Sequence, residues 1–255
     1  MRVITVNVNG VRSAAKKGLF AWLSSQRPDV VAFQETRSQE RHLTDESRTV
    51  DGMHAYYVDA ERKGYSGVAL LLRKEPVAVT RGLGWTDVDP EGRFVMADLG
   101  SLLVASVYVP SGTSGAARQA VKMRFLERFL IYLGQLRASG REYIVCGDYN
   151  IAHREIDTYD PVRNAKITGF FPEERAWMDD LIDRVGWVDA FRAVNTQAKQ
   201  YSWWANWPAA WQHNLGWRID YQMTTPGLAA RVKDAWIYRD ERFSDHAPVV
   251  VDYDL

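Results

Sequence analysis

The chain contains 255 residues with an ordinary globular composition, in which 46% of residues are apolar and 25% are charged. These values exclude a disordered chain, a collagen-like repeat and a coiled coil. Lysine and arginine together number 32, as do aspartate and glutamate, so the zero net charge argues against a polybasic nucleic-acid-binding protein of the histone type.

Strand and helix patterns alternate along the first half of the chain. A short amphipathic helix is predicted over 17–25, where apolar residues recur at helical spacing before Pro28. A Gly-Ser turn at 100–101 separates two apolar runs and predicts a hairpin. The β-rich or compact apolar runs predict five strands, over 2–8, 30–33, 67–72, 94–99 and 102–109.

The second half contains the clearest helix, over 118–136, where apolar residues keep helical spacing until Gly140. A second helix is predicted over 172–185, and strands over 143–146, 217–223 and 248–251. Strands are frequent and crossover helices are few. We therefore expect an α/β fold with two packed, mainly antiparallel sheets and helices outside them, rather than one parallel doubly wound sheet. We expect a single domain over residues 1–255.

The sequence also bounds the cellular setting. A single cysteine, Cys146, excludes an internal disulfide framework and a multi-cysteine zinc site. The N-terminal residues lack the apolar core of a secretory signal, and no apolar run approaches the length needed to span a bilayer. We expect a cytoplasmic protein without a membrane partner, and a monomer by default.

Carboxylate and amide side chains recur at the ends of predicted strands. Asn7 and Asn9 share one face of the first strand, because side chains alternate with period two. Hard divalent cations such as Mg²⁺ prefer oxygen ligands of this kind, and a histidine beside a carboxylate can act as an acid, a base or a phosphate donor. The other candidates in this pattern are Glu35, Asp148, Asn150, Asp220, Asp245 and His246.

Seven segments, taken in order, resemble the exonuclease III/AP endonuclease family of DNA-repair nucleases, and especially its bacterial exonuclease III-type members. They extend from the first predicted strand to the last and read TVNVNGVRSA (5–14), FQET (33–36), SVYVPSG (106–112), VCGDYNIAHREID (145–157), GFFPEERAW (169–177), GWRIDY (216–221) and SDHAP (244–248). The resemblance implies a four-layer α/β sandwich of the deoxyribonuclease I type. It also implies a Mg²⁺-dependent phosphodiesterase, with Mn²⁺ as an alternative ion.

The implied substrate is double-stranded DNA, cut 5′ to abasic sites or processed at 3′ ends. The expected activities are AP endonuclease, 3′→5′ exonuclease and 3′-phosphatase, in a ratio that the sequence does not set. The alternative is a phosphodiesterase of the same fold that acts on inositol phosphate, sphingomyelin or RNA, because substrate choice in shared folds depends on the loops. A catalytically silent binding protein is disfavoured, because Glu35, Asp148, Asp220 and His246 are all present.

The resemblance assigns roles to individual residues. Glu35 matches the main metal ligand, Asn9 and Asp245 would help to hold the metal or its waters, and Asn7 would support the site by hydrogen bonds. Asp148 would orient or deprotonate the attacking water and Asn150 would bind the scissile phosphate. Asp220 and His246 would form a pair whose imidazole faces a phosphate oxygen, and Tyr108 would contact the phosphate or the leaving group. Trp203, Trp217 and Ile219 would form an apolar pocket for a flipped-out abasic sugar. Asn164 and Arg218 are expected to contact DNA.

Three positions depart from the family pattern. Asp160 and Ile167 stand where asparagines that contact the DNA backbone are common, and Ser111 stands where other members have asparagine or glutamine. These changes leave the metal and water machinery intact. They bear on how strongly abasic DNA is held.

Overall fold

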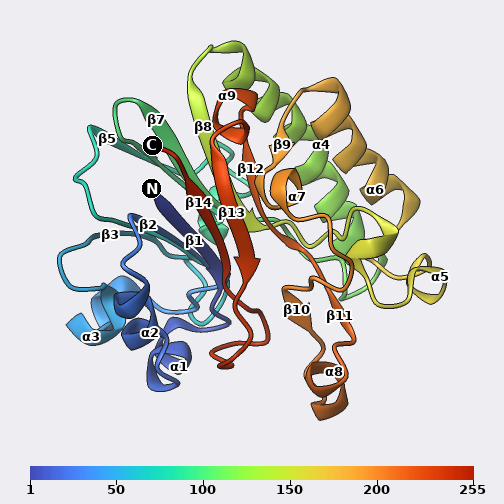
Figure 1. Cartoon of the computed structure of the whole chain (residues 1–255), viewed down its shortest axis with the longest axis horizontal. Coiled ribbons are helices and arrows are strands. Elements are labelled where there is room, and N and C mark those ends of the chain that lie inside the picture. The colour runs from blue at the N-terminus through green and yellow to red at the C-terminus, as the bar shows by residue number, and fades with distance from the viewer.

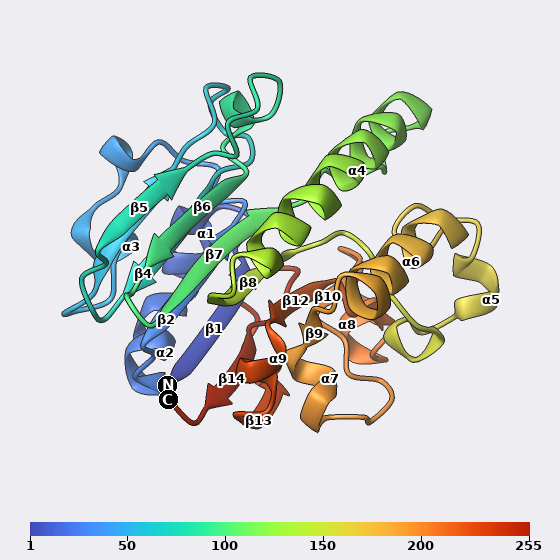
Figure 2. The ribbon, with the colours of Figure 1, turned by 90° about the horizontal axis from the view of Figure 1, so that it is seen from above.

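Because side chains alternate along a strand, each strand can pack one face on the opposite sheet and the other face on the outer helices. In β1 (Arg2–Asn7), Val3 points into a cluster that also contains residues of the second sheet, whereas Ile4 and Val6 pack against the first helices. The computed structural model, which describes all 255 residues, therefore has four layers, with helices outside two facing sheets (Figures 1 and 2). This confirms the expected α/β sandwich.

Each main sheet has six strands. The first has the order β13-β14-β1-β2-β4-β3 and the second the order β5-β6-β7-β8-β12-β9. Besides β1, the first sheet contains β2 (Val30–Gln34), β3 (His54–Val58), β4 (Val68–Leu72), β13 (Val232–Ile237) and β14 (Val249–Tyr253). The second contains β5 (Ala78–Arg81), β6 (Phe94–Asp98), β7 (Leu102–Tyr108), β8 (Glu142–Asp148), β9 (Val188–Asp189) and β12 (Asp220–Thr224). A two-stranded ribbon joins β10 (Trp203–Trp204) to β11 (Gly216–Trp217).

Helices cover the outer face of each sheet. The first sheet packs against α1 (Val11–Lys16) and α2 (Leu19–Gln26), and the second against α4 (Ala116–Ala138) and α6 (Pro172–Asp179). The short helices are α3 (Asp45–Arg48), α5 (Pro161–Asn164), α7 (Ala190–Val194), α8 (Pro208–Gln212) and α9 (Pro226–Ala229). Three-residue 3₁₀ turns lie at η1 (Glu40–His42), η2 (Asp89–Glu91) and η3 (Glu155–Asp157), and a π-helical turn, η4 (Asp180–Arg184), follows α6. No helix has the length and apolarity needed to cross a membrane.

Two parallel strand pairs bring the chemically important strand ends together. Most pairings are antiparallel, as expected, but β1 pairs with β2 and β7 with β8 in parallel, so both sheets are mixed. The carboxyl ends of β1, β2, β7 and β8 therefore meet at one end of the sandwich. Antiparallel β12 begins at this same end, where Asp220 lies opposite Asp148.

The observed elements correct the predicted ones in three places. The helix expected over 17–25 corresponds to α2, which begins at Leu19 after Gly18 in the left-handed region with φ of 90°, and the preceding helix α1 was not predicted. β3, β5 and β13 were not predicted. The expected continuous strand over 217–223 is interrupted, because the Arg218 backbone N–H donates to Asp157 and the Ile219 carbonyl accepts from Tyr149. The hairpin of β6 and β7 and the long helix α4 are confirmed.

Polar side chains connect the two sheets inside the apolar interior. The Gln34 amide, on the first sheet, donates to the Ser106 hydroxyl of the second, and that hydroxyl donates to the Phe33 carbonyl. The Gln222 amide, on the second sheet, donates to the carbonyls of Val3 and Val249 on the first. These groups are fully buried and hydrogen-bonded, as buried polar groups must be to avoid a large desolvation cost.

A buried ion-pair network fixes the segment before β12. Asp157, in η3, accepts hydrogen bonds from Arg192 and Arg218, and Arg218 also pairs with Asp189 at 2.8 Å. Burial alone would raise the pKa of Asp157, but the two guanidinium groups outweigh it and hold that pKa well below its ordinary value.

The Asp157→Asn variant is expected to lose about 3 kcal/mol of unfolding free energy at pH 7, because removing one partner leaves buried charge uncompensated. A depressed folded-state pKa adds stability above the ordinary aspartate value and loses it as the pH falls below about 4. The difference between wild type and variant should therefore shrink between pH 4 and pH 2. Urea unfolding followed by circular dichroism measures both quantities. The exposed pair of Asp180 and Arg184 provides a control, since Asp180→Asn should change stability little at either pH. A difference that does not vary with pH would contradict an ionised Asp157.

Candidate active site

Two similar turns form the base of the site. At the end of β1, the Asn7 side-chain oxygen accepts the Asn9 backbone N–H, and at the end of β8 the Asp148 carboxylate accepts that of Asn150. Both are Asx turns, which asparagine and aspartate favour. Asn9 and Asn150 have φ values of 43° and 52°, in the left-handed region that asparagine tolerates better than most residues. The spacing of the N-V-N and D-Y-N motifs thus has a local structural cause.

Asn7 joins the two halves of the site. Its amide nitrogen donates to Glu35 Oε1 at 2.8 Å and to Asp148 Oδ2 at 2.9 Å. Glu35 follows β2 in the first sheet and Asp148 ends β8 in the second. Asn7 therefore holds two carboxylates in a fixed relation across the sheets.

His246 lies between two buried aspartates. Its Nδ1 is 2.9 Å from Asp220 Oδ2, and its Nε2 is 3.9 Å from Asp148 Oδ2. Burial opposes protonation of the ring, but Asp220 above all, with Asp148 and Asp245, raises the pKa of His246 above its ordinary value. His246 is therefore an imidazolium at neutral pH, with Nδ1–H donating to Asp220 and Nε2–H directed toward Asp148.

The carboxyl group of Asp148 also has a shifted pKa. Burial, and next the charge of Asp220, raise the pKa of Asp148 above its ordinary value, although His246 and Asn7 oppose this shift. A carboxylate with a raised pKa accepts a proton more readily at neutral pH, as a general base requires. Asp220 is held by the Ser202 hydroxyl at 2.6 Å and by His246, while its second oxygen, Oδ1, is buried without a partner.

A second group of polar contacts surrounds Asp245. Its carboxylate accepts the Asn9 amide at 2.7 Å, the Ser244 hydroxyl at 3.0 Å and the Trp203 indole N–H at 3.3 Å. Burial would raise the pKa of Asp245, but the charge of His246 and the hydrogen bonds from Asn9 and Ser244 lower it, so the group remains ionised.

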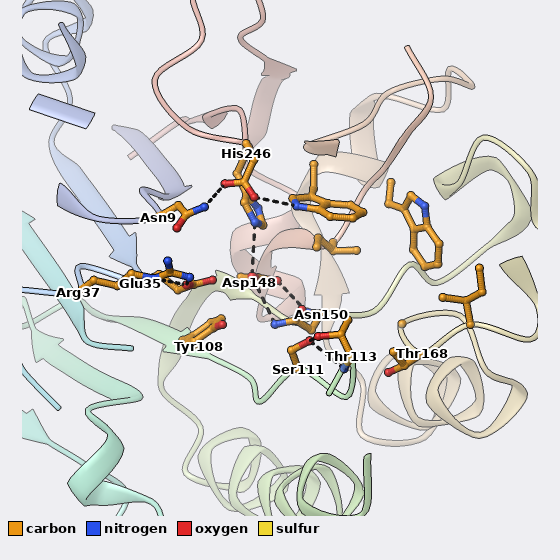
Figure 3. A pocket seen from close by; sticks show the side chains of 16 residues that line it. Asn9, Glu35, Arg37, Tyr108, Ser111, Thr113, Asp148, Asn150, Thr168 and His246 are labelled. Atoms are coloured by element: carbon orange, nitrogen blue, oxygen red, sulfur yellow. Dashed lines mark hydrogen bonds and ion pairs between the residues drawn. The ribbon is translucent and has the colours of Figure 1, made fainter. Parts of the chain in front are cut away.

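Tyr108 lies at the end of β7 on the same wall of the site as Glu35 (Figure 3). Burial first, and then the charges of Glu35 and Asp148, raise the pKa of Tyr108 well above its ordinary value. Tyr108 is therefore a neutral phenol that can donate a hydrogen bond.

These side chains open into one cavity of about 290 Å³ at the end of the sandwich. One wall carries Glu35, Arg37 and Tyr108, and Asp148 and His246 lie centrally (Figure 3). The cavity also has an apolar wall: Trp203, Trp217 and Ile219 line it, and the Trp203 and Trp217 rings meet edge to face at 6.3 Å. The cavity thus places an apolar surface beside a cluster of charged groups.

Two of the expected DNA contacts are not at the surface. Arg218 is 1% exposed, and its guanidinium is held by Asp157 and Asp189, so the expected DNA contact of Arg218 is corrected to a structural role. Asn164 is also 1% exposed and donates to the Thr158 hydroxyl, which directs its amide inward and corrects its expected contact in the same way. Asp160 accepts the Arg163 backbone N–H and begins α5, whereas Ile167 is exposed at the mouth of the cavity.

Several residues near the site were not predicted from the sequence. Arg37 contacts Glu35, and the cavity is also lined by Thr113 and Thr168. Ser111, one of the positions that depart from the family pattern, lines it as well. Behind them, the fully buried Lys122 donates to the Asn150 carbonyl at 2.7 Å and pairs with the buried Glu174. Lys122 lies on the long helix α4 among apolar residues. Its burial could not be predicted without knowing that Glu174 lies opposite it, because a lysine is rarely buried unless it is paired.

Two arrangements of oxygen and nitrogen atoms could hold a metal ion. Asp148, Asp220 and His246 place ligand atoms within 4.8 Å of one another, but these atoms already bond to one another or to neighbouring donors, since His246 Nδ1 meets Asp220 and Asp148 accepts from Asn7 and Asn150. Glu35, Asn9 and Asp245 offer oxygen atoms only, which suits a hard divalent cation. The Asn9 side-chain oxygen accepts no hydrogen bond from the protein, and Glu35, Asn9 and Asp245 line the same cavity. The second arrangement therefore fits better.

Comparisons with known proteins agree with this geometry. Residues 4–246 match the model of the Endonuclease/Exonuclease/phosphatase family. The chain is 35% identical over 251 residues to an exodeoxyribonuclease of Bacillus subtilis, with 98% of each chain covered. Among solved structures, an AP endonuclease from Archaeoglobus fulgidus and a 3′-5′ exonuclease from Neisseria meningitidis each superpose with a TM-score of 0.92 at 28% identity, and all of each chain is covered.

Proposed function

The chain belongs to the endonuclease/exonuclease/phosphatase family, and on that basis we propose that it is a DNA-repair phosphodiesterase that cuts 5′ to abasic sites, at 3′ ends, or both. The family resemblance identified from the motifs is confirmed. The observation that carries the proposal is the single cavity in which Glu35, Asp148 and His246 face an apolar wall of tryptophans. The non-DNA alternative has no comparable support, because relatives that match the whole chain are named exodeoxyribonuclease and AP endonuclease.

We propose that a divalent cation, Mg²⁺ or Mn²⁺, is held by Glu35 with Asn9 and Asp245, and that Asn7 orients Glu35. When bound, the cation would neutralise charge on the phosphodiester and favour attack on phosphorus.

The remaining roles belong to the protein's own side chains. Asp148 would hold the attacking water and take its proton, because its pKa is raised and its orientation is fixed by Asn7 and Asn150. The His246 imidazolium, held by Asp220, would donate to a phosphate oxygen on which charge develops. The Asn150 side chain lines the cavity, and its amide donates to the Val109 carbonyl and, weakly, to Asp148. Asn150 would therefore lie beside the same phosphate. Tyr108 would donate from its neutral hydroxyl.

The apolar wall gives the cavity a second property. Trp217 packs edge to face on Phe170 and on Trp203, and with Ile219 forms a surface that offers few hydrogen bonds to a base. Such a surface suits a sugar that has lost its base and has been turned out of the helix. Ile167 extends this apolar surface at the cavity mouth, where an asparagine is common in the family.

One duplex in three versions tests the proposal: with an abasic-site analogue, with a 3′-phosphate at a nick, and with a recessed 3′-hydroxyl. We expect Mg²⁺-dependent cleavage or 3′ processing of at least one version, no reaction in EDTA, and loss of about 10³-fold or more in Glu35→Ala. Cutting at the abasic site would show that Asp160 and Ile167 are tolerated, and processing confined to 3′ ends would indicate an end-trimming enzyme. Failure on all three versions with either Mg²⁺ or Mn²⁺ would exclude the proposed function.

A further inference from the structure

Arg37 forms an ion pair with Glu35 inside the cavity. Its Nε donates to Glu35 Oε2 at 2.7 Å, and its Nη2 donates to the same oxygen. The other oxygen of Glu35, Oε1, already accepts the Asn7 amide. Both oxygens of the carboxylate are therefore engaged in the structure.

The Asn7 and Arg37 contacts of Glu35 differ in how firmly each donor is held. Asn7 is fully buried and also bonded to Asp148, so its amide is fixed. The Arg37 side chain is 43% exposed, and its backbone is anchored by an N–H bond to the Ser66 carbonyl at 2.8 Å. Its guanidinium can therefore leave Glu35 for solvent while its backbone stays in position.

The charges explain why a cation lies there. Glu35 and Asp148 share the Asn7 amide, and Asp245 lies on the same cavity, so several carboxylates face a partly desolvated space. Like charges at such separations repel one another strongly unless a cation compensates them. His246 serves Asp148 and Asp220, which leaves Arg37 as the cationic partner of Glu35.

We propose that Arg37 is an internal counter-cation that a divalent metal must displace from Glu35 Oε2, so that Arg37 sets how tightly the metal binds. The inference rests on the proposed function, which assigns the metal to Glu35. A metal and a guanidinium would compete for one oxygen. The more stable the Arg37–Glu35 ion pair is, the weaker metal binding should therefore be.

The size of the effect follows from the exposure of the pair. Partly exposed ion pairs contribute little to stability, so removing the guanidinium should tighten metal binding by about two- to tenfold rather than by orders of magnitude. With Arg37 present, the protein would thus need a higher metal concentration to fill the site than a variant without it.

Titration with Mn²⁺, followed by the electron paramagnetic resonance signal of the free ion, measures affinity without any cleavage. We expect Arg37→Gln to bind Mn²⁺ about two- to tenfold more tightly than wild type. Arg48→Gln is the matched control, because Arg48 forms a pair of similar exposure with Glu40 outside the cavity, and its Mn²⁺ affinity should not change. Equal or weaker binding by Arg37→Gln would overturn the inference, whereas absence of Mn²⁺ binding by wild type would overturn the metal site itself.

A second measurement follows the contact directly. The ¹H–¹⁵N correlation of Arg37 Nε, assigned by its absence in Arg37→Gln, reports the hydrogen bond to Glu35 in the metal-free protein. Saturating Mg²⁺ should move this resonance to the position of a solvent-exposed arginine, and the resonance of Arg48 should stay in place. An Arg37 resonance that remains unchanged when Mg²⁺ binds would mean that metal and guanidinium share the carboxylate, and would contradict displacement.

Discussion

Replacing Asp148 with asparagine is expected to lower the rate of the chemical step by about 10³-fold, within the range that a positioned general base contributes. The substitution removes the proposed proton acceptor. It also disturbs the local bonds, because Asp148 Oδ2 accepts the Asn7 amide and Oδ1 accepts the Asn150 backbone N–H. An asparagine offers one acceptor oxygen in place of two, so one of these donors would face an amide N–H₂.

Single-turnover cleavage of the best duplex substrate at saturating Mg²⁺ measures this effect. DNA affinity should stay close to wild type or increase, because a negative charge near phosphate is removed. Asp87→Asn is a matched control, since Asp87 is exposed and pairs with Arg128 on the outer helix, and its rate should match wild type. A loss of less than tenfold in Asp148→Asn would show that another group takes the proton.

The His246→Gln variant should lose about 10²–10³-fold in kcat, the range found when one preorganised donor to a developing negative charge is removed. Glutamine keeps a side-chain donor but loses the positive charge. The variant should also be less stable, because the buried Asp220 carboxylate would lose its cationic partner.

A double variant separates the two consequences. Asp220 contacts His246, and the proposed mechanism has it act on the substrate only through that residue, so Asp220→Asn added to His246→Gln should change kcat by no more than about threefold, as expected for residues that act as a unit. The same addition should restore stability, because it removes the buried unpaired carboxylate. Single-turnover kinetics and urea unfolding on the four proteins of this cycle provide both values. Additive losses in kcat would mean that Asp220 has a role of its own at the substrate.

The clustering of the candidate site residues was predictable because each belongs to a short motif at the end of a strand. Asn7, Asp148 and Asn150 repeat the same Asx turn, and Asp220 and His246 precede or begin strands that start at that end of the sandwich. Strand periodicity and turn preference are local properties that a sequence displays. The convergence of these motifs in one cavity was supplied by the family resemblance, since the order of strands in each sheet is not a local property.

The residues whose burial was not predicted share a different feature. Arg218 and Lys122 are charged, yet each is buried against a partner distant in the sequence, and Asn164 is buried against Thr158. Arg218 meets Asp157 and Asp189, and Lys122 meets Glu174. A buried charge is stable only because its partner is present, and the partner's position depends on tertiary structure.

Arg37 was missed for a related reason. It follows the F-Q-E-T motif and would be expected to be one of many solvated arginines. Its φ of 49° turns the chain so that its side chain lies back along Glu35, which spacing alone does not indicate. The strained corner that carries Glu35, Thr36 and Arg37 is a property of this turn and of its bonds to Ser66 and Gly67.

The buried bridges of Gln34 and Gln222 bear on the motions that the molecule can make. Sliding of one packed layer over another is a common mode of conformational change in proteins. Here it would break hydrogen bonds between fully buried groups, and it would also separate Glu35 from Asp148, which Asn7 joins. The two sheets should consequently move as one rigid body on the timescale of turnover, and adaptation to differently shaped DNA would fall to the loops around the cavity mouth, such as the segment that carries Ile167.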